Sequence, residues 1–152
     1  MKTGRGRKLT SGEIALGRSL FGSCIDWARI GVFQAPSFLG FSAMVPLGHT
    51  IVFSKWRAAQ DFSKAEASEQ SWFVHELAHV WQAKRGVVLA AAKLSALGKN
   101  AYAYTARTGA KLKDYNIERQ AEIARHLYLE RVGAPEHGAP QRAWLEDVWA
   151  GR

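Results

Sequence analysis

The segment His75-Glu76-Leu77-Ala78-His79 places two histidines four positions apart, with a glutamate directly after the first. On a helix, residues four apart lie on one face, so both imidazoles can reach a single metal ion. Glu76 lies about 100° around the helix from His75, and it therefore flanks the ion instead of binding it. We expect one zinc ion per chain, held by His75 and His79, with Glu76 as the general base.

This set of residue types predicts a hydrolytic reaction. Zinc held by neutral imidazoles keeps one coordination position open for water and lowers the pKa of that water toward about 7. A nearby carboxylate then takes the proton, and the activated water attacks a carbonyl carbon. We expect a peptide or protein substrate and cleavage of its amide bonds. The competing interpretations are two core histidines with a surface glutamate, and a zinc ion bound without catalysis.

The residues around the motif favour a metal site. They are apolar on nearly every side of the helix: Trp72, Phe73, Val74, Leu77, Ala78, Val80 and Trp81. Such a pattern is typical of a buried helix. Buried polar groups need partners, and one metal ion with its water satisfies two histidines and a glutamate together.

An open zinc site needs a third protein ligand. Glu118 and Glu122 stand one turn apart on a later predicted helix and project the same way. We predict that Glu118 binds the metal. We also predict that Glu122 accepts a hydrogen bond from the outer N–H of a ligating histidine, with His75 favoured over His79. The alternative is a solvated face on which Arg119 and Arg125 balance both glutamates.

Other residues compete for the remaining roles. Rival third ligands are His49, His126 and His137, each of which also fits an ordinary surface or core histidine. Amide hydrolysis further requires a donor aimed at the developing oxyanion. Four residues are eligible, and their order is left open: Tyr102, Tyr104, Tyr115 and His126.

Local patterns predict the helices that carry these residues. Thr10 and Glu13 form a capping box that starts a helix over residues 11–21. Residues 66–85 contain neither Gly nor Pro, and Gly86 follows them, which predicts the motif helix. Three further helices are expected over residues 87–97, from a cap at Asp114 or Asn116 to about residue 132, and over residues 141–149.

Residues 30–53 are rich in β-forming side chains and turn residues. They predict a small sheet with strands at 30–34, 38–45 and 50–53. The strand at 50–53 suggests an edge that pairs with an extended peptide, with an ordinary core strand as the alternative. The expected fold class is α+β, predominantly helical, with a small N-terminal sheet, the motif helix and a following glutamate-bearing helix.

Composition predicts one domain. The chain has 152 residues, 47% hydrophobic and 22% charged, with a formal net charge of +8. Basic residues and glycines alternate in residues 1–8, which predicts a disordered basic arm before a domain over residues 9–152. A basic chain can bind nucleic acid, but no phosphate loop, helix-turn-helix or basic-aromatic ladder is present, which argues against such a partner.

The single cysteine, Cys24, excludes an internal disulfide and a thiolate zinc cluster. The N-terminus has no apolar region of the signal-peptide type, and the longest apolar stretch, residues 87–92, is too short to cross a bilayer. We expect a cytoplasmic protein without a membrane span, with any export following a route that needs no N-terminal signal peptide.

The segments HELAHVWQ at 75–82 and NIERQAEI at 116–123 resemble the gluzincin branch of the zincin metallopeptidases. In that family a glutamate-bearing helix follows the motif helix. The resemblance implies a zincin-like domain in which His75, His79 and Glu118 bind zinc and Glu76 is catalytic. It also implies that Glu122 supports a histidine, although many gluzincins have aspartate at that position.

A closer resemblance joins LTSGEIALGRSLFG, HELAHVWQAKRG and YNIERQAEI to small bacterial proteins labelled Vgr-related or Rhs-associated. These are predicted peptidases linked to type VI secretion, and the similar region covers residues 9–128. The resemblance implies a cellular context and a secretion-system partner. It leaves a second function open, a non-catalytic zincin-like binding or accessory module of a bacterial secretion system.

Overall fold

The computed structural model describes residues 6–36, 43–46, 48–55, 57–96 and 100–152. Its helices and strands are, in chain order, β1 (Gly6–Lys8), α1 (Ser11–Phe21), β2 (Gly31–Gln34), β3 (Ala43–Met44), β4 (Thr50–Phe53), α2 (Ala67–Lys84), α3 (Leu89–Ala96), α4 (Ile117–Arg131) and α5 (Arg142–Ala150). Short 3₁₀ turns lie at Phe62–Lys64 and Leu112–Asp114. The predicted α+β class, with more helix than strand, is confirmed.

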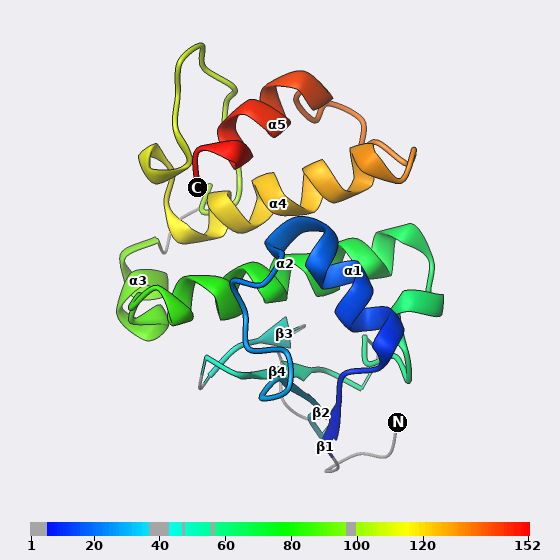
Figure 1. Cartoon of the computed structure of the whole chain (residues 1–152). Helices are drawn as coiled ribbons and strands as arrows, with labels where there is room; N and C mark the ends of the chain where they lie inside the picture. The colour runs from blue at the N-terminus through cyan, green and yellow to red at the C-terminus, as the bar shows by residue number, and fades with distance from the viewer. Residues whose placement is uncertain (1–5, 37–42, 47, 56, 97–99) are drawn as a thin grey trace.

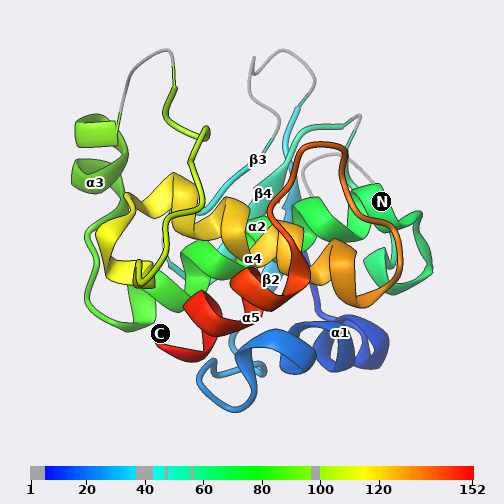
Figure 2. The same cartoon turned by 90° about the horizontal axis from the view of Figure 1, so that it is seen from above.

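The elements lie in layers. Figure 1 shows the small sheet, then α2, then α4, and α5 on the far side of α4. Seen from above in Figure 2, α4 runs over α2, and α1 lies to one side next to α5. The α1–α5 contact includes the Trp149 indole N–H, which donates to the carbonyl of Leu20 at 3.2 Å. Buried apolar side chains from all of these layers form one core cluster.

The sheet has the strand order β1-β2-β4-β3. The pair β2 and β4 is parallel, whereas β1 and β3 pair antiparallel at the two edges. Side chains alternate along each central strand, so Ile51 and Phe53 of β4 are buried. The prediction that the strand at 50–53 is an edge is therefore wrong, because β3 covers that side of it.

A stack of phenylalanines fixes α2 to the sheet. Phe53 of β4 lies 4.6 Å from Phe62, ring centroid to ring centroid, and Phe62 stacks on Phe73 of α2 at 4.9 Å. All three side chains are almost fully buried. Because α4 covers the opposite side of α2, the motif helix is enclosed on nearly every side, as its apolar surroundings predicted.

The predicted helices are confirmed to within a few residues. The capping box is present, since Thr10 accepts from the backbone N–H of Glu13 at 3.1 Å and the Glu13 carboxylate accepts from that of Thr10 at 2.9 Å. Asn116 caps α4 by accepting from the backbone N–H of Arg119 at 2.9 Å. Of the strand predicted at 38–45, residues 38–42 lie outside the described residues and Ala43–Met44 form β3.

The basic arm is ordered where the structure describes it. Arg7 donates to both carboxylate oxygens of Glu13, at 2.7 and 2.6 Å, and Glu13 is fully buried. Burial of a carboxylate requires such partners, so the Arg7 side chain anchors the segment that pairs with β2. The prediction of a disordered arm is wrong for residues 6–8, and residues 1–5 lie outside the described residues.

Length and hydropathy bear on the membrane prediction. Within the described residues, none of the helices is both long enough and apolar enough to cross a bilayer. This agrees with the short apolar stretches of the sequence.

A substitution at Gly17 tests how closely α1 packs against the motif helix α2. A Cβ added at Gly17 would meet the Trp27 ring at 2.5 Å and Leu77 of α2 at 3.0 Å. We expect Gly17→Ala to lower the free energy of unfolding by about 1–2 kcal/mol, because overpacking outweighs the roughly 1 kcal/mol gain in helix propensity. Chemical denaturation followed by tryptophan fluorescence measures the change.

The matched control for this substitution is Gly151→Ala. A Cβ there meets only the carbonyl of Val148, at 3.7 Å, so we expect a change within about 0.5 kcal/mol. Equal effects of the two substitutions would contradict the packing described for α1.

Candidate metal centre

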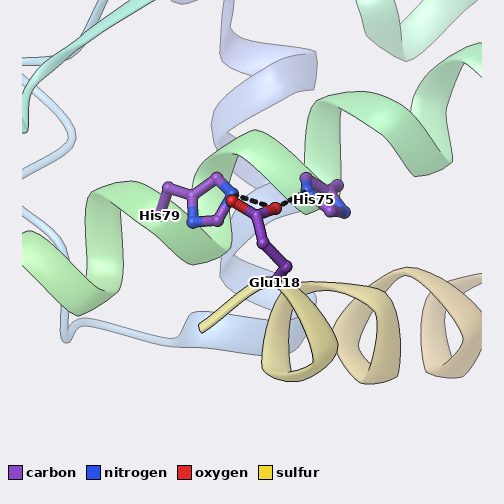
Figure 3. Close-up of side chains that lie close together, drawn as sticks. All are labelled: His75, His79 and Glu118. Atoms are coloured by element: carbon purple, nitrogen blue, oxygen red, sulfur yellow. Dashed lines mark ion pairs between the residues drawn. The ribbon is translucent and has the colours of Figure 1, made fainter. Parts of the chain in front are cut away.

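Three side chains converge between α2 and α4. His75 and His79 extend from α2 toward Glu118 of α4, as Figure 3 shows. The Nε2 atoms of His75 and His79 lie 3.4 and 3.2 Å from Oε2 of Glu118. One ligand atom from each of the three residues lies within 4.8 Å of the others, so the cluster could hold a metal ion. All three side chains are buried.

The helix pair explains why these residues meet. His75 and His79 share one face of α2 because they are one turn apart, and this face packs on α4. The Asn116 cap starts α4 and places Glu118 in its first turn, the end of the helix where a carboxylate is most favourable. The position of Glu118 therefore follows from the start of α4.

The outer nitrogen of His79 has a neutral partner. Its Nδ1 lies 2.8 Å from Oε1 of Gln82, whose Nε2 donates to the carbonyl of Ile117 at 2.9 Å. Because the amide nitrogen of Gln82 is the donor to Ile117, its oxygen must accept from His79. In the neutral tautomer selected by this hydrogen bond, the proton is on Nδ1 and the lone pair of Nε2 lies on the side of Glu118.

The outer nitrogen of His75 has a charged partner. Its Nδ1 lies 2.8 Å from Oε1 of Glu122, and Arg125 donates to both oxygens of Glu122 at 3.2 and 3.0 Å. Burial raises the pKa of Glu122, but hydrogen bonds from His75 and Arg125 outweigh it and lower that pKa to about 2. Glu122 is therefore ionised, and it orients His75 as a carboxylate orients a metal-bound histidine.

The two carboxylates beside His75 favour its protonated form. Burial lowers the pKa of His75, but hydrogen bonds to Glu118 and Glu122 more than compensate and raise it to about 9. The raised pKa favours the imidazolium, whose Nδ1 lies 2.8 Å from Oε1 of Glu122 and whose Nε2 lies 3.4 Å from Oε2 of Glu118. A metal ion would replace this proton, because only a neutral imidazole binds metal.

Two buried atoms indicate that the residues fit a metal ion with its water. Nε2 of His79 and Oε2 of Glu76 are inaccessible to solvent and have no hydrogen bond from the described part of the chain. Such atoms are costly unless a ligand completes them. Two imidazoles and one carboxylate form a common donor set of zinc sites that keep a position open for water. The donor set therefore fits the zinc ion expected from the sequence.

The rival histidines lie outside this cluster. Within the described residues, His49, His126 and His137 contribute no ligand atom to it. His126 instead lies between Tyr104, whose Oη is 2.6 Å from Nδ1, and Arg125, whose Nη2 is 3.0 Å from Nε2.

The structure separates the eligible oxyanion donors. The Tyr102 ring lies 6.1 Å from that of His75, and burial, followed by the charges of Glu118 and Glu76, raises the pKa of Tyr102. The Tyr115 hydroxyl, by contrast, donates to the carbonyl of Thr105 at 2.9 Å. Tyr102 is thus the candidate in ring contact with a predicted ligand, and its role as the donor stays a prediction.

Two residues of the site had no role in the sequence-based prediction. Gln82 is only 1% exposed and connects His79 to the residue before Glu118. Arg125 enters the sequence-based interpretation only through the alternative of a solvated face, yet it is 6% exposed and holds Glu122. The role of Gln82 could have been suspected from the sequence, because it is a polar residue on a helix predicted to be buried. Nothing comparable in the sequence indicates that Arg125 is buried.

We expect Gln82→Met to weaken zinc binding by about 10- to 100-fold, because it removes both the acceptor that orients His79 and the donor that holds the start of α4. Competition with a chromophoric chelator measures the affinity. Gln70→Met is the matched control on the same helix, because Gln70 donates to the carbonyls of Ser63 and Ala65 and not to a ligand. Unchanged affinity in Gln82→Met would contradict this role.

Comparisons with known proteins find similarity to a protein of a bacterial secretion system. No protein-family model matches it. It is 35% identical to the type VI secretion system spike protein VgrG2b of Pseudomonas aeruginosa, over 90% of this chain and 14% of that protein. The chain therefore spans about one seventh of the length of this curated relative.

A solved structure covers the matched portion. The effector domain of Pseudomonas aeruginosa VgrG2b is similar with a TM-score of 0.72 and 29% sequence identity, over 99% of this chain and 86% of that one. The predicted link to Vgr-related proteins of type VI secretion is confirmed by both matches. The chain is homologous to the effector domain of VgrG2b.

Proposed function

We propose that the chain is a zinc-dependent metallopeptidase that acts as an effector domain in type VI secretion. One observation carries the catalytic part of the proposal. The ligand atoms of His75, His79 and Glu118 lie within 4.8 Å of one another, and the neighbouring Glu76 is buried with one carboxylate oxygen that receives no hydrogen bond from the described residues. A catalytic base needs such an uncommitted oxygen to accept a proton.

Each residue of the site has a task in peptide hydrolysis. His75, His79 and Glu118 would hold the zinc ion, with Glu122 and Gln82 fixing the two imidazoles. When bound, zinc activates a water molecule and polarises the carbonyl of the substrate. Glu76 takes a proton from the attacking water and returns it to the leaving amine.

The number of ligands favours a catalytic site over a structural one. Structural zinc sites usually take four protein ligands, whereas catalytic sites take three and leave a position open. In the part of the chain that the structure describes, three residues form the cluster, and no fourth His, Cys, Asp or Glu joins it.

A second candidate function is a non-catalytic binding or accessory module of the secretion system. The comparisons favour this candidate more directly, because the names of both matched proteins specify a spike and an effector domain and specify no reaction. In either case we propose that a secretion-system protein is the partner, and that export uses this machinery without an N-terminal signal peptide.

Glu76→Gln separates the two candidates. We expect this variant to keep about one zinc ion per chain and to lose hydrolysis of an unfolded protein such as casein by at least about 100-fold, because the amide cannot accept the proton. Elemental analysis and release of peptides measure the two properties. Glu69→Gln, an exposed glutamate of the same helix, is the control and is expected to keep both.

His79→Ala and Glu118→Ala complete the series. Both are expected to lose or weaken zinc binding together with activity, because each removes a ligand. Hydrolysis retained by Glu76→Gln would contradict the mechanism. A wild-type chain that holds zinc and cleaves none of a broad set of unfolded proteins would make the accessory module the better description.

A further inference from the structure

A cavity of about 270 Å³ opens beside the candidate metal centre. Glu122 and His126 of α4 lie in its lining, together with Tyr102 and Tyr104 from one loop and residues 136–140 from another. The same Glu122 binds His75, and the ring of Tyr102 lies 6.1 Å from the ring of His75. The cavity therefore adjoins the place where a peptide would bind at the proposed metal centre.

The hydrogen bonds of His126 determine which way the hydroxyl of Tyr104 can donate. Arg125 lies 3.0 Å from Nε2 of His126, and a guanidinium can only donate, so Nε2 must be the acceptor. The proton of a neutral His126 is then on Nδ1 and is donated to Oη of Tyr104 at 2.6 Å. The Tyr104 O–H is left as a donor with no acceptor among the described residues.

Burial and the neighbouring Arg125 lower the pKa of His126, which agrees with this neutral form. The donor of Tyr104 therefore persists at neutral pH.

Glu136 supplies an acceptor in the same cavity. Its Oε2 accepts from Arg125 at 2.6 Å, whereas the contact of Oε1 is the Nε2 atom of His126 at 3.7 Å, which is too long for a hydrogen bond. The Glu136 side chain is 48% exposed, so Oε1 is accessible to a ligand. The Tyr104 hydroxyl, a donor, thus lies at Nδ1 of His126, and the acceptor Oε1 of Glu136 lies near Nε2 of the same ring.

We propose that this cavity is a substrate subsite for a carboxamide side chain, Asn or Gln, near the scissile bond. The proposal rests on the proposed peptidase function. The carboxamide oxygen accepts from Tyr104, and its NH₂ group donates to Oε1 of Glu136. One carboxamide therefore satisfies both free groups of the cavity.

Other side chains complement the cavity less well. An apolar side chain would cover the Tyr104 hydroxyl and Glu136 Oε1 without a partner for either. A carboxylate would face the negative charges of Glu122 and Glu136, and Arg125 already pairs with both. An ammonium group would pair with Glu136 but would leave the Tyr104 O–H without an acceptor.

Binding can be tested without any cleavage. The zinc-loaded full chain is titrated with N-acetylglutamine methylamide and with N-acetylnorleucine methylamide, which has a similar length but no carboxamide. NMR signals of the His126 imidazole report occupancy of the cavity. We expect the glutamine probe to bind more tightly, and Tyr104→Phe to weaken it by about three- to tenfold, because one hydrogen bond is lost. Tyr128→Phe is the control, since that hydroxyl donates to Gln70 and lies outside the cavity lining.

Cleavage specificity tests the same subsite during turnover. Mass spectrometry of an unfolded protein mixture digested by the chain is expected to show Asn and Gln enriched at one position near the cleaved bond. That enrichment should fall in both Tyr104→Phe and Glu136→Ala and persist in Tyr128→Phe.

Failure of the subsite can be distinguished from failure of the proposed function. Equal binding of the two probes, or cleavage without the Asn and Gln enrichment, overturns the subsite and leaves the peptidase proposal in place. A chain that binds the glutamine probe in a Tyr104-dependent way but cleaves no peptide retains the carboxamide site and refutes the peptidase.

Discussion

Charge burial between α2 and α4 is the constraint on which the rest of the site depends. Glu76, Glu118 and Glu122 are all buried, and within the described residues Arg125 is the one buried guanidinium beside them. Charges removed from water are unfavourable unless they are paired. The raised pKa of His75 means that a proton there supplies part of the compensation; a divalent cation would supply more, at the place where the imidazoles and Glu118 converge.

Helices α2 and α4, which carry the predicted ligands, are held together by polar contacts as well as by apolar packing. Gln82 joins α2 to the carbonyl of Ile117, and Glu122 joins α4 to His75. Each contact fixes an imidazole and the spacing of the helices at the same time. A shift of α4 would therefore disturb both histidines together. The geometry of the centre thus depends on how α2 and α4 pack, and not on single residues alone.

The sequence predicted the parts of the site that depend on local geometry. His75 and His79 share a face because of their spacing on one helix, and the Asn116 cap sets where Glu118 stands. The roles of Gln82 and Arg125 depend on which helix lies opposite, and no local pattern specifies that. The disorder predicted for Arg7 was wrong for a related reason. Composition describes the average solvation of a segment, whereas Arg7 is ordered by a specific contact, its two hydrogen bonds to the buried carboxylate of Glu13.

In the proposed peptidase, orientation of His75 and selection of the substrate share residues. Arg125 donates to Glu122, which orients His75, and also to Glu136 and His126 in the neighbouring cavity. Because a guanidinium has a fixed planar geometry, it holds these partners at set positions relative to one another. A side chain that enters the cavity therefore meets groups whose positions are already tied to the metal centre. If the chain is the proposed peptidase, preorganisation of this kind lets one set of contacts position both the groups at the metal centre and the substrate without further ordering.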